Sequence, residues 1–471
     1  MQQKALSLVT GVFCSFLWGC TMAPTYTQPD MPVAGTLPVP AAFSTGNASE
    51  SSTIPEVAAR GWADFYADPS LQELIATALE HNRDLKAAAL NVETLQAQYR
   101  IQRAELFPEI NGGGSWTKQR ALSGGNYVTG EMYGLSVGVT SYELDLFGRV
   151  RSLNEDALQQ YLAQEETYRG AIISLVAETA RAYLSLLSDQ QLLTISEDTA
   201  RNQADVFQLV QQRYDEGISN RMELAQSRTA LETAKKNLAM YKLQIIQDNN
   251  SLALLAGTSV PNQVRPSLAL EDHNLALPLP ANLSSQVLLQ RPDIRAAEHA
   301  LLAANANIGA ARAAFFPRIS LTGSAGYMSP EFSDLFESAT GVWAFTPSIT
   351  VPIFTGGRLS AQLDVAQLRK EVAIVQYEKA IQSAFYEVAD ALAAEQGLAE
   401  QVAAQRDYVQ ASQDYYDLAV ARYKEGVDSF LVQLDAQRSL FAAKQAYVTL
   451  RLAQQNNQVN LYKALGGGWK K

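Results

Sequence analysis

Two residues of opposite charge near the end of the chain have the spacing of an ion pair on a helix. Asp435 and Arg438 are three residues apart, and Leu431 lies four residues before Asp435. Residues three and four apart share one helix face, so these three side chains should project together. The chemistry that this pattern favours is charge pairing beside an apolar group. An ordinary solvated pair, which contributes about 0.2–0.5 kcal/mol, is the alternative interpretation.

Residues suited to catalysis or metal binding are few. The three histidines, His81, His273 and His299, have no partner at metal-ligand spacing, and we interpret each as structural or solvated. The sequence contains no nucleophile elbow, phosphate-binding loop or paired metal motif, and TGGR at 355–358 indicates a turn into a helix. We therefore expect no enzyme, no cofactor and no catalytic or metal site.

Charge and cysteine usage narrow the classes of partner further. The net charge is −11, whereas contact with nucleic-acid phosphates needs a basic face, so we expect no nucleic acid as a partner.

Cys14 lies in a short apolar run that ends before Cys20, which is typical of an export signal and too short to span a membrane. A mature chain with Cys20 alone can form neither an internal disulfide nor a thiolate metal site.

The stretch LWGC, residues 17–20, resembles the lipobox of bacterial lipoproteins. That resemblance implies that residues 1–19 are a signal peptide and that Cys20 becomes the lipidated N-terminus. Thr21 follows where an acidic residue would resemble an inner-membrane retention signal, so sorting to the outer membrane is implied. Trp18 stands where a small residue is usual. A plain secretory signal with an unrelated cysteine is the alternative.

A repeat with one constant offset organises the rest of the chain. RYDEG at 213–217 recurs as RYKEG at 422–426, an offset of 209 residues. The same offset relates Asp84/Asp293, Phe107/Phe316, Pro108/Pro317, Arg149/Arg358, Glu178/Glu387, Lys235/Lys444 and Gly257/Gly466. We therefore expect two copies of one structural unit, at 71–257 and 283–466. Outside the copies we expect an extended N-terminal tether at 20–70, a Pro-rich linker at 258–282 and a C-terminal tail at 467–471.

Each copy should contain a helix, two strands and a long helical hairpin. Helices are expected at about 71–106 and 283–314, each ending at a Phe-Pro pair. In the first copy, a long helix over about 148–216, with a break near 188–195, should end at a left-handed cap on Gly217. The RYDEG and RYKEG stretches are therefore predicted to be the tips of two hairpins.

A new helix should start after each tip. Asn220, with Glu223 three residues later, resembles a capping box. Asp428 and Ser429 are expected to do the same after Gly426 in the second copy.

Alternating side chains predict four strands, at about 109–118, 133–142, 318–327 and 342–351. In the last of these, Trp343, Phe345 and Ile349 fall on one face and small residues on the other, as in a strand that spans an outer membrane. Beyond the signal no run approaches 18 apolar residues, so we expect no transmembrane helix. Open sheet edges are not tolerated in hydrocarbon, so four strands need further copies to close a barrel of eight or twelve. A soluble sandwich with one buried face is the alternative.

Several stretches together resemble TolC-type outer-membrane efflux proteins, specifically the lipoprotein branch that serves drug-efflux pumps of Gram-negative bacteria. They are WADFYADPSLQELIATALEHNRDL, LLQRPDIRAAEHALLAANANIGAARAAFFPRISLTGSAGY, PIFTGGRL and RYKEGVDSFLVQLDAQRSLFAAKQAYV. The resemblance implies a mainly α fold with a small membrane β part, built from duplicated helical-hairpin units. It also implies a homotrimer with a twelve-stranded outer-membrane β-barrel, continued by a periplasmic α-helical barrel.

The resemblance assigns candidate site residues. A closed aperture near the periplasmic end would be formed by Leu431, Asp435 and Arg438, with Tyr423 and Glu223 beside them. Glu223 has a competing part in helix capping, and the first copy has Gln226 where the second has Asp435. The adaptor-contact tips would be Glu216, Gly217, Ile218, Glu425, Gly426 and Val427, for which simple helix termination is a compatible interpretation.

The function implied is the exit duct of a tripartite drug-efflux system. It would be a passive channel, lipid-anchored in the outer membrane with a long periplasmic portion, that opens on docking with a periplasmic adaptor and an inner-membrane transporter. Alternatives are a duct for type I protein secretion or metal-ion efflux, and a periplasmic coiled-coil scaffold lipoprotein without a pore. No methionine-rich or histidine-rich stretch favours metal ions as cargo.

Overall fold

The computed structural model describes residues 21–39, 44–45, 61–258, 268–273, 275, 277, 279–280 and 283–469. The predicted signal peptide and the lipidation at Cys20 lie outside the described residues. The chain forms two compact units. The strand unit consists of the described residues up to Asp30 with Asn91–Glu165 and Ala296–Glu378, and the hairpin unit of Met31–Leu90, Glu166–Arg295 and the segment from Lys379.

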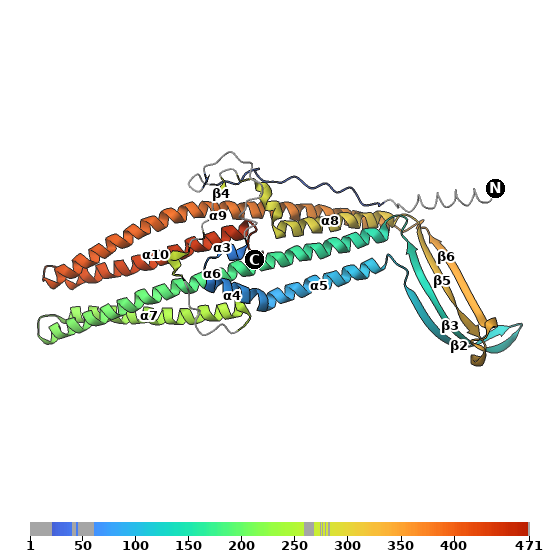
Figure 1. Ribbon diagram of the computed structural model, residues 1–471, viewed down its shortest axis with the longest axis horizontal. Coiled ribbons are helices and arrows are strands. Elements are labelled where there is room, and N and C mark those ends of the chain that lie inside the picture. Colours follow the sequence, from blue (N-terminus) through green and yellow to red (C-terminus); the bar gives the residue numbers. More distant parts are fainter. Residues whose placement is uncertain are drawn as a thin grey trace. The chain divides into compact units, whose positions relative to one another are not determined.

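The strand unit contains a four-stranded antiparallel sheet (Figure 1). Its strands are β2 (Ile110–Ser123), β3 (Asn126–Leu144), β5 (Arg318–Ser329) and β6 (Gly341–Thr350), in the spatial order β2-β3-β5-β6. All four strands were predicted, but β2 and β3 continue beyond the alternating pattern to a turn at Gly124 and Gly125, both with positive φ. Within the described chain β2 and β6 each have one edge without a strand partner.

The apolar side chains of the sheet lie on one face. Register places Leu135 opposite Tyr327, and Ala325 opposite Trp343, so these residues share a face, which we call the apolar face. Trp343 is 78% exposed and Phe345 61% exposed. All residues of β6 are exposed, so no other described element covers this strand on either side. The sandwich alternative required a buried face, and the structure does not provide one.

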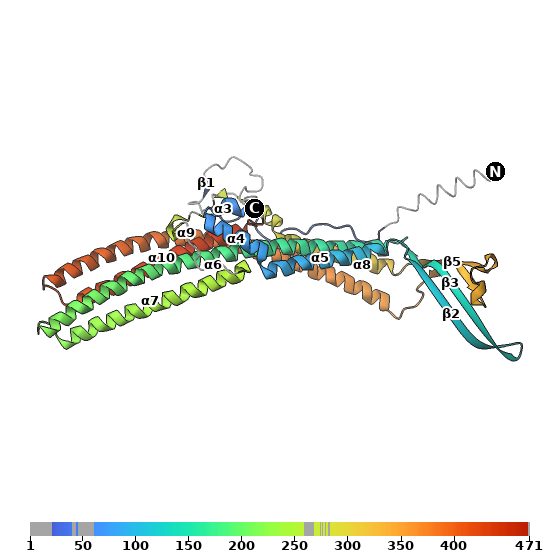
Figure 2. The same cartoon turned by 60° about the horizontal axis from the view of Figure 1, so that its bottom comes forward.

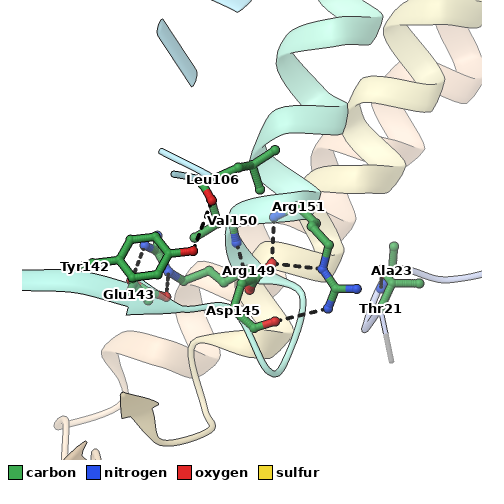
Figure 3. A network of polar contacts seen from close by, with 9 residues as sticks. All are labelled: Thr21, Ala23, Leu106, Tyr142, Glu143, Asp145, Arg149, Val150 and Arg151. Carbon is green, nitrogen blue, oxygen red and sulfur yellow. Dashed lines mark hydrogen bonds and ion pairs between the residues drawn. The ribbon is translucent and has the colours of Figure 1, made fainter. Parts of the chain in front are cut away.

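The start of α6 is fixed to the end of β3 by a network of carboxylates and arginines (Figure 3). Glu143 accepts two hydrogen bonds from Arg149, at 2.8 and 2.7 Å, and pairs with Arg318 at 2.6 Å. Asp145 accepts hydrogen bonds from the backbone N–H groups of Val150 and Arg151, which are orphan donors at the helix start. The second copy has Pro352 and Phe354 at the positions of the two carboxylates, so this junction is specific to the first copy.

The long helices of the two copies are α6 (Arg149–Asp215) and α9 (Arg358–Lys424), each of 67 residues, or about 100 Å. The predicted break near 188–195 is wrong. That stretch has neither Gly nor Pro, and Leu192 within it and Leu187 directly before it are buried, so packing keeps it helical.

The expectation of no transmembrane helix rested on the lack of a long apolar run, but that lack does not exclude a helix of sufficient mean hydropathy. One stretch of α6 is apolar and long enough to do so by length and composition. Because 56% of that stretch is buried inside the chain, we interpret it as part of a packed core.

The hairpin unit pairs α6 with α7 (Arg221–Ala256) and α9 with α10 (Phe430–Ala464), as Figure 2 shows. Helices α5 (Arg83–Ala104) and α8 (Pro292–Ala313) begin in this unit, α5 following α4 (Pro69–His81). The short elements are β1 (Ser44–Thr45), α3 (Trp62–Phe65), η2 (Leu270–Asp272), β4 (Leu279–Pro280), η3 (Ser285–Gln290), η4 (Phe332–Asp334) and η5 (Ser338–Thr340).

Arg291, the first residue of the RPDIR stretch at 291–295, bonds to the end of a helix in the second copy. Arg291 is buried and donates a hydrogen bond to the carbonyl of Ala464 at 2.7 Å. In the first copy Asn82 donates to the carbonyl of Leu255 at 2.9 Å, which is the same contact 209 residues earlier. Each bond satisfies a carbonyl in the last turn of a helix. Arg291 also pairs with Glu387 at 2.7 Å.

Candidate gate and hairpin tips

The two hairpin tips have the same backbone geometry. In the first, the N–H of Ile218 donates to the carbonyl of Arg213 at 2.8 Å, and the N–H of Gly217 to that of Tyr214 at 3.0 Å. These bonds form a Schellman motif, which needs a left-handed residue, and Gly217 has φ 73°. The second tip makes the same bonds 209 residues later, with φ 71° at Gly426. The predicted helix reversals are therefore present in the structure.

The six predicted tip residues lie at the surface. Ile218 is 62% exposed and Val427 61% exposed, so each tip carries an apolar side chain at the surface. Their neighbours Glu216, Gly217, Glu425 and Gly426 are exposed as well.

After the first tip, only one of the two hydrogen bonds of the predicted capping box forms. Asn220 accepts a hydrogen bond from the N–H of Glu223 at 3.0 Å, as expected for an N-cap. The Glu223 carboxylate does not return to the backbone of Asn220. It accepts hydrogen bonds from the hydroxyl groups of Ser219 and Tyr423, each at 2.6 Å.

After the second tip the predicted capping is wrong. Ser429 precedes α10 but makes no side-chain hydrogen bond to it. Asp428 instead pairs with Arg422 through two hydrogen bonds of 2.5 and 3.0 Å. The bidentate pair is the stronger interaction, because both partners are charged, and it lowers the pKa of Asp428.

Tyr423 and Glu223 connect the two hairpins. Tyr423 packs in a buried cluster with Val210, Phe430 and Leu434, and the guanidinium of Arg213 lies 5.3 Å from its ring centre. Burial and the adjacent carboxylate of Glu223 raise the pKa of Tyr423 to about 12. The phenol therefore stays protonated and donates its hydrogen bond throughout the physiological range.

Leu431, Asp435 and Arg438 lie on the exposed side of α10. Leu431 is 56% exposed, whereas Leu434 is 3% exposed and faces the cluster. Asp435 and Arg438 do not pair with each other, and no hydrogen bond or ion pair to either side chain occurs within the described part of the chain. The ordinary i,i+3 pair is thus absent, and both charges are available to another molecule.

Comparison with known proteins gives the family. A model of outer membrane efflux proteins matches residues 74–258 and again 283–467, so the two matches differ by the offset of the repeat. The chain belongs to the outer membrane efflux protein family. Its match to the family over both copies confirms the duplication.

The relatives of this efflux protein include pump components. It is 46% identical over 474 residues to the probable efflux pump outer membrane protein TtgC of Pseudomonas putida, covering 100% of this chain and 96% of TtgC. It is 42% identical to the cation efflux system protein CusC of Escherichia coli O157:H7, covering 96% and 97%.

A solved structure shares the fold. The open-state MtrE outer membrane channel of Neisseria gonorrhoeae is 44% identical, with a TM-score of 0.86 and coverage of 96% of this chain and 99% of MtrE. The predicted fold class, outer-membrane location and efflux-duct function are confirmed. The relatives are channel and efflux proteins rather than enzymes.

Sequence reasoning on this efflux protein missed three side-chain contacts of the hairpins, two of them at the tips. Ser219 and Asp428 occupy matching positions in the two copies, but one bonds to Glu223 and the other to Arg422. A side-chain hydrogen bond also joins Gln203 of α6 to Gln437 of α10. The repeat alignment indicates which positions match, but not that their partners differ.

Proposed function

We propose that three copies of this chain form a passive exit duct for drug-like compounds, which opens at the hairpin tips when a periplasmic adaptor and an inner-membrane transporter dock. The observation that supports the trimer is the sheet. Its four strands leave β2 and β6 open at their edges, and hydrocarbon does not tolerate open edges. Three copies supply twelve strands and close the barrel, whereas an isolated chain cannot.

The repeat predicts how neighbouring chains of the trimer pair. Within one chain β3 pairs with β5, and the equivalent pair between chains is β6 of one chain with β2 of the next. A residue of β5 matches the residue of β2 that lies 209 positions earlier. Between the bulge at Ser141 and the turn at Gly124, a residue of β3 matches the residue of β6 that lies 210 positions later, because an even offset keeps the apolar side chains of β3 and β6 on the same face. Gly138 lies opposite Ser324. Ser348 should therefore lie opposite Ser115 of the next chain.

Disulfide cross-linking tests this register. The double variant Ser348→Cys, Ser115→Cys should oxidise to covalent dimers and trimers on a non-reducing gel, and each single variant should remain monomeric. As a matched control, Ala344→Cys with Ser115→Cys moves one thiol by four residues, about 13 Å along the strand, and should not cross-link. Cross-linking of the control alone would contradict the register, and monomers throughout would contradict the closed barrel.

We further propose that Leu431, Asp435 and Arg438 form the gate. Their exposure and lack of partners within the described chain fit contacts to the other two copies around a three-fold axis. A charge pair at ~4 Å is worth about 1–4 kcal/mol between water and an effective protein dielectric. Three such contacts are strong enough to keep an aperture closed and weak enough for a docking partner to open. Tyr423 and Glu223 would hold the hairpins in the closed arrangement.

The six tip residues, Glu216 to Ile218 and Glu425 to Val427, are proposed to contact the adaptor. An exposed apolar side chain beside a glycine cap gives each tip a small apolar knob, which fits a protein partner.

Cargo choice would belong to the transporter. Cation efflux is the second candidate, because CusC is a cation efflux protein by name. Restoring tolerance to drugs or to toxic cations in a strain that lacks its own outer-membrane efflux protein distinguishes the two.

Lipidation at Cys20 is proposed to anchor each chain. The first described residues lie along α8 in the strand unit, where Arg312 donates to the carbonyl of Met22 at 3.3 Å and Asn305 to that of Pro24 at 2.8 Å. These contacts fix the segment that follows the cysteine. Mass spectrometry of the mature N-terminus tests the modification: a diacylated or triacylated Cys20 is expected, and an unmodified residue would contradict it.

A further inference from the structure

A hollow lies on the apolar face of the sheet, over β2 and β3. We call the direction along these strands toward their connecting turn at Gly124 outward. Gly114 lies opposite Leu135, so one side of this pair has no side chain, and the next pair outward is Trp116 with Tyr133. A cavity of about 620 Å³ lies against these residues. A side chain added at Gly114 would meet nothing closer than 3.9 Å, so the space is open.

The segment 330–340, which we call the cap, folds back over this hollow. Its Phe332 ring lies 5.6 Å from that of Tyr133, and its Phe336 ring lies 5.9 Å from that of Tyr327. Leu335 is buried, but Phe332 and Phe336 remain 67% and 66% exposed. A cap with two exposed phenylalanines on the apolar face forms the wall of an apolar groove that faces the bilayer rather than water.

The face changes from apolar to charged directly beyond the hollow. The next pair outward is Lys118 with Glu131, whose charges meet at 2.6 Å and balance. The following residue on that face of β2 is Arg120, whose guanidinium lies 5.1 Å from the ring centre of Tyr127. No carboxylate pairs with Arg120 among the residues that the structure describes. One positive charge is therefore left over at the outer rim, beside Tyr127.

We propose that this groove binds a phosphorylated lipid of the outer leaflet, with an acyl chain in the hollow and a phosphate on Arg120. Six residues of strand separate Gly114 from Arg120, or about 20 Å. That length matches the distance from the phosphate of a lipid to the end of its acyl chain, because half a bilayer with its headgroups is about 20 Å thick. A guanidinium binds phosphate through two parallel hydrogen bonds, which suits Arg120 to this role. The proposal does not depend on the gate or on cargo.

Lipid binding to the purified full-length protein tests the proposal. Native mass spectrometry would compare diphosphoryl lipid A with the same lipid after removal of its phosphates, at equal concentrations. EDTA is included, because magnesium could otherwise bridge Glu331 or Glu337 of the cap to phosphate. We expect wild-type protein to retain the phosphorylated lipid about tenfold more strongly, since charge-assisted hydrogen bonds are lost with the phosphates.

Three variants separate the parts of the site. Arg120→Gln should lose that tenfold preference, and Gly114→Leu, which fills the hollow, should weaken binding of both lipids. Arg358→Gln removes an exposed arginine that bonds to Gln362 at the start of α9, and should bind both lipids as wild type does. Circular dichroism and gel filtration would establish that each variant is folded.

Three results would overturn the proposal. Equal retention of both lipids by wild-type protein would remove the phosphate site, and unchanged binding in Gly114→Leu would remove the acyl groove. Displacement of lipid A by inorganic phosphate alone would also contradict it, because the hollow should make the whole lipid the preferred occupant.

Discussion

The hydroxyl of Tyr423 donates a hydrogen bond to the carboxylate of Glu223 across 2.6 Å, joining residues that are 200 positions apart. Tyr423 lies in the last turn of α9 in the second copy, and Glu223 lies in the first turn of α7 in the first. The bond thus connects the two hairpins next to their tips. Because Tyr423 is 7% exposed, little water competes for this hydrogen bond. Opening that moves one hairpin against the other must break it.

Removing the Tyr423 hydroxyl should loosen the tips. Tyr423→Phe keeps the ring in its cluster but loses a hydrogen bond to a charged acceptor, which is worth about 1.5–3 kcal/mol. Faster hydrogen–deuterium exchange is expected at 213–223 and 422–430. Tyr408→Phe is the matched control, because Tyr408 is 53% exposed on the same helix. Equal exchange in both variants would show that the bond does not hold the hairpins together.

A carboxylate pair between α6 and α7 should make the hairpin unit sensitive to pH. Burial and the adjacent Asp248 raise the pKa of Asp189 to about 7. The folded chain therefore keeps a proton at this site that the unfolded chain loses above about pH 4. The protonated Asp189 therefore adds to the free energy of unfolding at low pH, and this contribution is lost as the pH rises from about 4 toward 7.

Thermal unfolding at pH 5 and pH 8 checks this effect. Asp189→Asn cannot ionise, so it should unfold at a higher temperature than wild type at pH 8, by about 2–4 °C. The gain is small because Asp189 is only half-buried. The two proteins should differ less at pH 5. Asp198→Asn, on the exposed side of the same helix, should show no such dependence, and a similar response there would contradict the assignment.

A buried carboxylate holds the linker region to the first copy. Asp68 is fully buried, caps α4 through the N–H of Ser70 at 2.9 Å and accepts the hydroxyl of Tyr183 at 2.6 Å. The Nε2 atom of His273 lies 3.5 Å away. Burial lowers the pKa of His273, so this histidine is neutral in the folded chain at neutral pH.

Two measurements follow from that arrangement. Asp68→Asn should destabilise the protein by about 1–3 kcal/mol in denaturant unfolding, because buried hydrogen bonds lose a charged acceptor. Asp64→Asn, at an exposed site nearby, should have little effect. The unfolded chain binds a proton at His273 below about pH 6.5 and the folded chain does not, so stability should fall as the pH drops below that value. His273→Gln should remove that part of the dependence.

The local features of this fold could be read from the sequence, and the long-range ones could not. The caps at Gly217 and Gly426 were predictable because a left-handed residue after a helix leaves a local signal. The break near 188–195 was wrong because the burial of Leu187 and Leu192 depends on distant helices. Packing of that kind overrides local propensity.

The same division holds at the candidate site. The shared face of Leu431, Asp435 and Arg438 follows from their spacing, whereas the bond from Tyr423 to Glu223 joins two copies and has no local signature. The outer parts of β2 and β3 were missed because Lys118 and Arg120 interrupt the apolar alternation. Those residues belong to the rim rather than to the apolar band.

Single-channel conductance in planar bilayers tests the central claim most directly. The full-length trimer would be compared with the Asp435→Ala, Arg438→Ala double variant. The matched control is Asp198→Ala, Arg201→Ala, which removes an exposed i,i+3 pair that does form, at 3.5 Å, on α6. We expect small, brief currents from wild type and control and a much larger, sustained conductance from the gate variant. Equal conductance in all three proteins would contradict the gate, and no conductance from any inserted trimer would contradict the duct.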